Sequence, residues 1–247
     1  NMKQLIFCIC LIVLIASCEL SKPTKSPNSM NISRPNEASD GITVFLTGNM
    51  LGALKPCGCS GGQLGGLDRR PAIFNTVPAD KRLLIDTGAL VENKLKQDKI
   101  KFLTITEAFD YLKYDIVNLT KQDLEIAQDF GMLGNSSLNF ITPYESYEDI
   151  APGYQNKLNL DGEDVSIVTV SYDPEIASLE YIKEIFPKEH GNRSVNILIL
   201  NADKNADFDS IAADIAQLGI VDCIICPINS DEPTVLSKRG EKPIVCA

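Results

Sequence analysis

The sequence predicts an α/β fold, because apolar runs of strand length alternate with amphipathic stretches of helix length. The runs ITVFLT at 42–47 and RLLID at 82–86 come first, and a Gly-rich loop follows the first of them. Hydrophobic residues make up 44% of the 247 residues. That share is enough to bury one substantial core or two small ones.

The elements can be assigned in order along the chain. We expect helices over about 66–78, 100–113, 121–131, 174–186 and 207–219. We expect strands over 42–47, 82–86, 115–119, 138–142, 195–200 and 222–226, with short closing strands within 233–237 and 242–247. Between them, residues 156–172 read as a hairpin whose turn is Asp161-Gly162, a dipeptide typical of tight turns.

Charge and histidine content exclude two classes of protein. The net charge is −10 and the basic residues are scattered, which argues against nucleic-acid binding, since phosphate contacts need clustered Lys and Arg. The chain has a single histidine, His190. Imidazole is the commonest ligand in transition-metal sites, so one histidine cannot build a conventional site for two metal ions.

The N-terminus reads as an export signal. Lys3 precedes the apolar run 5–16, and the run ends at Ala16-Ser17-Cys18, which is typical of a bacterial lipobox with Cys18 as the lipid attachment site. An ordinary signal peptide or a short anchor helix is the alternative. We therefore expect a signal peptide at 1–17 and a flexible tether at 18–40, rich in Pro, Ser, Asn and Lys. The globular domain at 41–247 would be anchored to a membrane of the bacterial cell envelope, on its periplasmic or outer surface.

Residues 47–70, TGNMLGALKPCGCSGGQLGGLDRR, and 83–88, LLIDTG, carry a family resemblance. Together with YDIVNL at 114–119 and DCIIC at 222–226, they resemble the 5'-nucleotidase branch of the calcineurin-like metallophosphoesterases. The resemblance covers about 42–247. It implies two mixed β-sheets sandwiched between helices, with the site loops at the carboxyl ends of strands. Because the family normally continues further, it also implies that a C-terminal domain is missing.

Every metal-ligand position of the family that we can align is changed here. Asn49 and Ala89 replace aspartates, and Leu51 replaces a histidine. Gln122 stands at the histidine of the third motif, Ala202 at a later histidine, and Ile228 and Ser230 in the last histidine motif. Such residues cannot lower the pKa of a bound water as the family's metal ions do. We therefore expect no catalytic residues and no metal site of the family type.

The cysteines are what this chain has in place of those ligands. Cys57 and Cys59 lie in the long loop after the first strand, and Cys226, with Cys223, closes the strand before the last motif. These pairs would border the former metal site as a dithiol couple or a thiolate-bound metal site. The alternatives are a structural disulfide for Cys57 and Cys59, and small buried side chains on strands for Cys223 and Cys246.

Three functions remain open from the sequence alone. The domain is a binding or structural module that has lost its chemistry, or a thiol-redox or metal-thiolate protein that works beside periplasmic electron carriers. The alternative is a metal-dependent phosphoester or nucleotide hydrolase with atypical ligands. The missing ligands are the evidence for the first of these, and Cys57 and Cys59, with Cys226, would carry the second.

Overall fold

A computed structural model describes residues 41–55, 66–133, 136–144, 150–160, 162–186, 194–202 and 206–227, together with the backbone of 234–235 and 244–246. All of the described residues belong to one compact unit, which lies within residues 40–247. Cys18 and the expected signal peptide and tether lie outside them.

Four parallel strands form the first sheet, in the order β1-β2-β3-β4. They are β1 (Thr43–Thr47), β2 (Arg82–Asp86), β3 (Ile116–Asn118) and β4 (Phe140–Ile141). The segments between them form α2 (Arg70–Phe74), the 3₁₀ helix η1 (Ala79–Lys81), α3 (Lys96–Leu112) and α4 (Lys121–Asp129). Because the strands are parallel, their carboxyl ends meet at one edge of the sheet.

The second sheet is mixed and has the order β5-β6-β7-β8-β10-β9. Its strands are β5 (Gly153–Leu160), β6 (Glu163–Tyr172), β7 (Ser194–Leu200), β8 (Cys223–Cys226), β9 (Thr234–Val235) and β10 (Ile244–Cys246). Strands β6, β7, β8 and β10 are parallel, and β5 and β9 pair antiparallel at the two edges. Two helices, α5 (Leu179–Ile185) and α6 (Phe208–Gln217), belong to this half.

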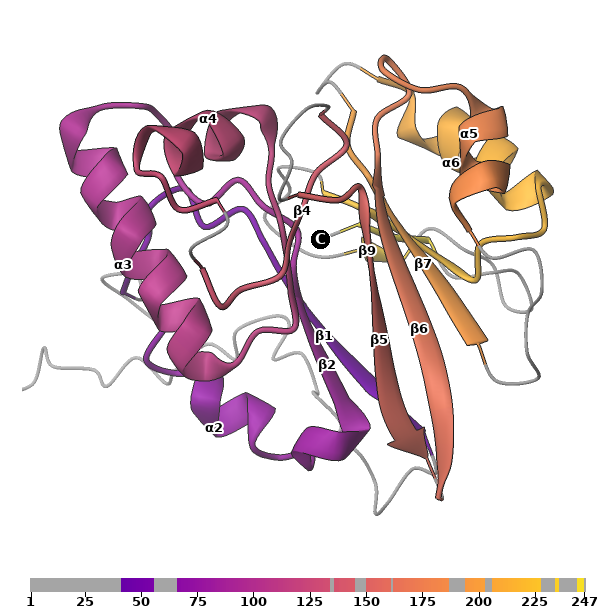
Figure 1. The fold of residues 1–247 in the computed structure, drawn as a ribbon, viewed down its shortest axis with the longest axis horizontal. Coiled ribbons are helices and arrows are strands. Elements are labelled where there is room, and N and C mark those ends of the chain that lie inside the picture. The colour runs from indigo at the N-terminus through magenta and orange to yellow at the C-terminus, as the bar shows by residue number, and fades with distance from the viewer. Residues whose placement is uncertain are drawn as a thin grey trace, which may run out of the picture. The chain divides into compact units, whose positions relative to one another are not determined.

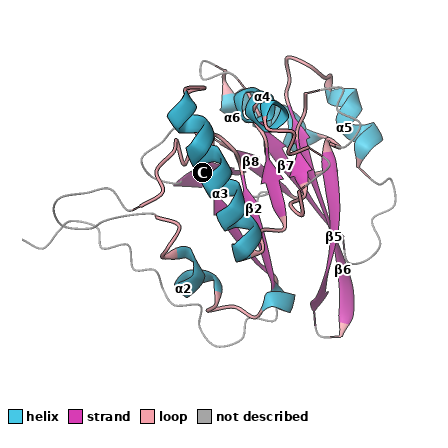
Figure 2. Cartoon of the chain, turned by 60° about the vertical axis from the view of Figure 1, so that its left-hand side comes forward, coloured by secondary structure: helices cyan, strands magenta, loops and turns pink. Residues whose placement is uncertain are grey.

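Three apolar clusters hold these layers together. Phe102, Ile105 and Phe109 of α3 pack on one face of the first sheet. The opposite face of that sheet contributes Ile85 and its neighbours to a second cluster, which the inner face of the second sheet completes. A third cluster lies between the second sheet and α5 and α6. Figures 1 and 2 show the resulting order of helices, sheet, sheet and helices.

This architecture confirms the predicted α/β sandwich, and the differences lie in the helix ends. The helix expected over 66–78 is only five residues long, because Pro71 fits its first turn and the amides of Thr76 and Val77 bond three residues back, to Ile73 and Phe74, in tight turns after Phe74. The helix expected over 174–186 begins later, at Leu179, since Asp173 caps a turn before it. The hairpin is present as predicted, with Gly162 at φ +83°. None of the described helices is long and apolar enough to cross a membrane.

A ring of three buried polar side chains links the two sheets. Asn118, the last residue of β3, donates from Nδ2 to Asn201 Oδ1 at 2.9 Å. Asn201 donates to Ser171 Oγ at 2.8 Å, and the Ser171 hydroxyl donates back to Asn118 Oδ1 at 2.5 Å. Asn118 also donates to the Thr87 carbonyl at 2.9 Å. Each residue is at most 7% exposed, so water cannot replace these bonds.

Replacing Asn118 with Ala should destabilise the domain by roughly 2–4 kcal/mol, because it leaves buried polar groups of Asn201, Ser171 and Thr87 without their partner. Urea denaturation of the purified domain measures this loss. Asn93→Ala, at an exposed position, is the control and should leave the stability within about 0.5 kcal/mol of the wild type. An Asn118→Ala midpoint equal to that of the control would show that the ring is not needed.

Candidate functional site

The described residues that align with metal-ligand positions of the family follow the carboxyl ends of strands. Asn49 and Leu51 follow β1, and Ala89 follows β2. Gln122 lies in the first turn of α4, directly after β3, and Ala202 follows β7. Ile228 and Ser230, predicted in the last motif, lie outside the described residues, as do Cys57 and Cys59.

Three of these positions have an unusual backbone conformation. Asn49, Leu51 and Ala89 have φ values of 49°, 48° and 56°, in the left-handed region. In the described chain, Lys113 is the one further residue other than glycine with positive φ. Leucine and alanine in this region cost on the order of 1–2 kcal/mol each. Their surroundings must therefore supply the energy that keeps them there.

Part of that energy comes from pairing between the first two loops. The amides of Asn49, Leu51 and Gly52 donate to the carbonyls of Gly88, Ala89 and Leu90, at 3.0, 3.1 and 2.8 Å. These bonds continue the β1–β2 pairing beyond the ends of the strands. The two loops are therefore joined backbone to backbone.

Burial of neighbouring side chains supplies more of the energy that keeps these residues in the left-handed conformation. Met50, between the two left-handed residues of the first loop, is 6% exposed, and Leu90 is fully buried, both within the core beneath α3. Burying a side chain of this size contributes about 1.5–3 kcal/mol. Leu51, in contrast, is 39% exposed. The left-handed turns thus place Met50 and Leu90 in the core while leaving Leu51 outside it.

The carboxylate of Asp123 holds the second loop. Its Oδ2 accepts the Ala89 amide at 2.9 Å, and its Oδ1 accepts the Leu90 amide at 3.1 Å. Oδ2 also accepts the Thr120 hydroxyl at 2.7 Å, in a capping box that begins α4. Asp123 is fully buried, and this burial outweighs the hydrogen bonds from Thr120, Leu90 and Ala89, raising its pKa to about 6.

A second buried carboxylate, that of Asp86 at the end of β2, has hydrogen-bond partners on the adjacent backbone and a nearby cation, Arg70, at the start of α2. It accepts the Thr47 hydroxyl at 2.6 Å and the Gly88 amide at 3.0 Å. Arg70 Nη1 lies 3.8 Å from Asp86 and donates to the Tyr114 hydroxyl at 2.5 Å. Burial nevertheless raises the pKa of Asp86, against the opposing charge of Arg70. Burial, with the Asp86 charge second, also raises the pKa of Tyr114 to about 12.

These side chains do not fit the metal ions that the fold implies. Leu51 and Ala89 end in hydrocarbon, and Gln122 donates its amide Nε2 to the Val91 carbonyl at 2.9 Å. The carboxylates of Asp86 and Asp123 are committed to hydrogen bonds within the fold. Within the part of the chain that the structure describes, no group of three or more His, Cys, Asp or Glu side chains could hold a metal ion.

The structure separates the two cysteines of β8. Cys223 is half-buried and packs in the cluster between the sheets, whereas Cys226 is fully buried in the cluster beneath α5 and α6. Residues three apart on a strand point to opposite faces, so β8 does not bring the two thiols together. The predicted convergence of a CxxC pair on one pocket is therefore wrong. Burial, and secondarily the Asp222 charge, raise the pKa of Cys223 to about 11, which keeps it a neutral thiol.

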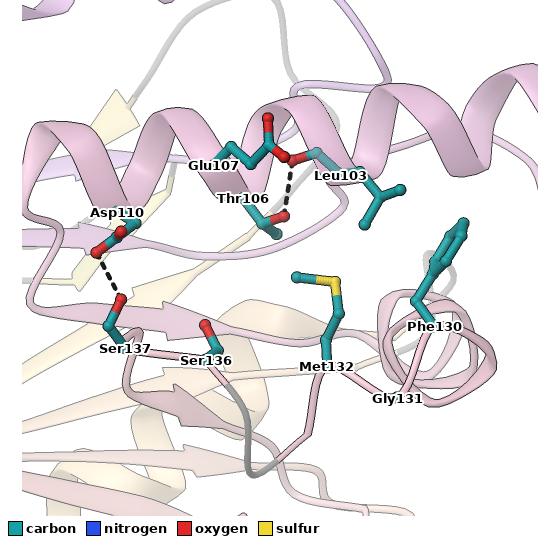
Figure 3. A pocket seen from close by; sticks show the side chains of 9 residues that line it. All are labelled: Leu103, Thr106, Glu107, Asp110, Phe130, Gly131, Met132, Ser136 and Ser137. Carbon is teal, nitrogen blue, oxygen red and sulfur yellow. Dashed lines mark hydrogen bonds between the residues drawn. The ribbon is translucent and has the colours of Figure 1, made fainter.

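A pocket of about 380 Å³ opens elsewhere, between α3 and the segment that follows α4 (Figure 3). Its lining combines acidic and apolar side chains, among them Glu107, Asp110, Leu103, Phe130 and Met132. The Ser137 hydroxyl donates to Asp110, another lining residue, at 2.6 Å. None of the residues predicted as site residues lines this pocket.

Sequence reasoning missed the residues that shape the loops. Asp123 had a readable signal, because Thr120-x-x-Asp123 is the pattern of a capping box. Asp123 also accepts the Ala89 and Leu90 amides, which lie 33 or more residues away in sequence. No local sequence pattern signals this second role. The sequence indicated Arg70 only as the last residue of GGLDRR, within the segment that carries the family resemblance. Nothing local to Asn118, Ser171 or Asn201 signals their ring.

Comparison with solved structures identifies the fold. No family model and no curated protein matches the sequence. The chain is similar to the 5'-nucleotidase precursor from Thermus thermophilus, with a TM-score of 0.58, 16% identity and coverage of 83% of this chain and 48% of that one. It is similar to the Haemophilus influenzae NAD nucleotidase, with a TM-score of 0.54, 13% identity and coverage of 83% and 44%. It is also similar to the 5'-nucleotidase from Candida albicans, with a TM-score of 0.54, 10% identity and coverage of 85% of this chain and 46% of that one.

The domain thus has the 5'-nucleotidase-like, calcineurin-like metallophosphoesterase fold that the sequence motifs predicted. At these identities the likeness establishes the fold and leaves the activity open. The chain spans slightly less than half the length of each of the three structures.

Replacing Asp123 with Asn should destabilise the domain at pH 7 by about 1–3 kcal/mol, because both oxygens accept amides and the Asn NH₂ must face one of these donors. Because the pKa of Asp123 is raised in the folded state, its contribution is largest below about pH 4. The stability advantage of wild type over Asp123→Asn should fall by roughly 3 kcal/mol as pH rises to about 6, then stay constant.

Urea denaturation between pH 4 and 8 measures this profile. Asp129→Asn, at the end of the same helix, is the control for removing an exposed carboxylate, one that pairs with Lys99. If the stability advantage of wild type over Asp123→Asn instead grows between pH 4 and 6, then hydrogen bonding, and not burial, sets the pKa of Asp123.

Proposed function

We propose that this chain is an exported lipoprotein whose 5'-nucleotidase-like domain no longer hydrolyses phosphoesters with two metal ions. In this proposal the domain serves the cell envelope as a binding or thiol-based module. The observation that carries it is the chemistry at the carboxyl ends of β1, β2 and β3. The positions that should bear ligands bear Leu51, Ala89 and an amide, Gln122, that is engaged with Val91.

Loss of these ligands removes the chemical basis of the ancestral reaction. Two-metal hydrolysis needs a cation that lowers the pKa of a bound water and neutralises the charge of the phosphate. Neither the hydrocarbon of Leu51 and Ala89 nor a neutral amide supplies anionic ligands for such a cation. The nearby carboxylates of Asp86 and Asp123 are held by Thr47, Arg70 and backbone amides.

The thiol role rests on Cys57 and Cys59. Their loop begins shortly after Leu51, and the Leu67 amide donates to the Leu54 carbonyl at 3.2 Å, so the chain leaves and returns at one point beside the first loop. Oxidation of the two thiols to a disulfide would release two protons and pass two electrons to a periplasmic electron carrier or a disulfide-bonded partner. Alternatively, the two thiolates would contribute to a metal site.

Export supports this chemistry. Cys18 would carry the lipid, and residues 19–40 would link it to the domain. Outside the cytoplasm a dithiol meets oxidising partners rather than a reducing thiol pool. A CGC loop on an exported scaffold is therefore suited to thiol exchange.

The purified domain should not hydrolyse AMP or p-nitrophenyl phosphate above background with added Mn²⁺ or Zn²⁺, because the mapped positions lack anionic ligands. The assay is release of inorganic phosphate or nitrophenol. Asn49→Ala is assayed in parallel. Metal-dependent turnover that Asn49→Ala abolishes would instead support a hydrolase with atypical ligands.

Cys57→Ser should remove a reducible bond or a bound metal ion while leaving the thermal unfolding midpoint nearly unchanged. Thiol counting in glutathione buffers and metal analysis measure the two possibilities. Cys223→Ser is the matched control, because the Cys223 thiol has a raised pKa and should not exchange. If wild type and Cys57→Ser show the same reducible thiols and the same metal content, the thiol role fails and the binding module remains.

A further inference from the structure

Two cysteines lie directly opposite each other on β8 and β10. These strands are parallel neighbours, and their register pairs Ile224 with Ile244 and Cys226 with Cys246. Neighbouring strands lie about 4.8 Å apart, which is within the Cα–Cα range of about 4.4–6.8 Å that a disulfide spans. We propose that Cys226 and Cys246 form a disulfide bond in the exported protein.

The register also assigns the two cysteines to one face of the sheet. Cys226 ends β8 and is fully buried in the apolar cluster beneath α5 and α6. Directly opposite residues of neighbouring strands share a face, because side-chain direction alternates with a period of two. Cys223 is the contrast on the same strand, since it packs in the cluster between the sheets and has Ile197 of β7 opposite it.

The position of β10 gives such a bond a structural consequence. This strand has three residues, and its other neighbour, the edge strand β9, has two. Strands this short are held by few hydrogen bonds, and a slip of one residue would turn each side chain to the opposite face. A bond from β8 would fix the register of β10. It would also close a loop of about 20 residues, which lowers the entropy of the unfolded chain.

The oxidation needs a partner that accepts electrons. As the S–S bond forms, the two thiols lose two protons and two electrons, and an exported thiol oxidant takes up both pairs as its own disulfide opens to a dithiol. Such oxidants act outside the cytoplasm, so the inference rests on the proposed export for its oxidant. Because Cys226 is fully buried in the folded domain, the bond would form during folding. It requires neither Cys57 nor Cys59.

Peptide mapping without reductant tests the proposal on the full chain isolated from cells after alkylation of its thiols. The peptide that contains Cys226 should be joined to the peptide that contains Cys246, and dithiothreitol should separate the two. The cross-link should persist in Cys223→Ser and in Cys57→Ser and should be absent from Cys246→Ser. A bond from Cys226 to any other cysteine would overturn the proposal.

Thermal unfolding gives a readout that two unlinked cysteines would not move. In a Cys57→Ser background, Cys246→Ser should lower the unfolding midpoint by roughly 5–10 °C without reductant. Dithiothreitol should lower the midpoint of the background chain to that of Cys246→Ser and leave Cys246→Ser unchanged. Cys223→Ser is the matched control, because it removes a thiol from β8 and should keep the dependence on reductant. A background chain with the same midpoint in both buffers would overturn the proposal.

Refolding separates a failure of this inference from a failure of the proposed function. The full chain is unfolded in urea and refolded in oxidised glutathione, which supplies the oxidant without export. If Cys226 and Cys246 are still alkylated as thiols after this treatment, the inference is overturned whatever the fate of the CGC loop. If the bond forms on refolding and is absent in cells, the pairing is upheld and the proposed export is contradicted.

Discussion

The carboxylate of Asp123 is the contact on which the site edge of the first sheet depends. It receives the Ala89 and Leu90 amides from one loop and caps α4 with Thr120 on the other. Through the paired amides of Asn49 and Leu51, the first loop depends on the second, and so on Asp123. One buried side chain thereby connects the chain segments after β1, β2 and β3.

Burying a carboxylate is costly unless hydrogen bonds compensate it, and Asp123 and Asp86 are compensated in different ways. Asp123 receives backbone amides and a hydroxyl, and within the described chain none of its hydrogen-bond donors is a cation. Asp86 receives Thr47 and Gly88 and lies near Arg70, whose guanidinium lies 5.5 Å from the centre of the Phe109 ring. One carboxylate orders loops and the other ties the end of β2 to the helices beneath it.

Much of the fold was predictable from the sequence because its strands are buried and bounded by turn residues. The run RLLID predicted β2 to the residue, and Asp161-Gly162 predicted the hairpin. The helix ends were less predictable, since α2 begins at Arg70, next to Pro71, and gives way to tight turns after Phe74. At the site, motif spacing placed Asn49, Leu51, Ala89 and Gln122 at the strand ends. The bonds of Asp123 and Asn118 could not be predicted, because they join residues more than 30 positions apart. The period of a strand, applied to Cys223 and Cys226, could have shown that these thiols point apart.

The ring of Asn118, Ser171 and Asn201 has a mechanical consequence. Between the sheets, the packing of side chains such as Ile85 and Ile199 within one apolar cluster is non-directional. Hydrogen bonds have fixed directions, and the Thr87 carbonyl sets the orientation of the Asn118 amide. The ring therefore opposes sliding of one sheet over the other. It thereby fixes the distance between the end of β3 and the ends of β6 and β7.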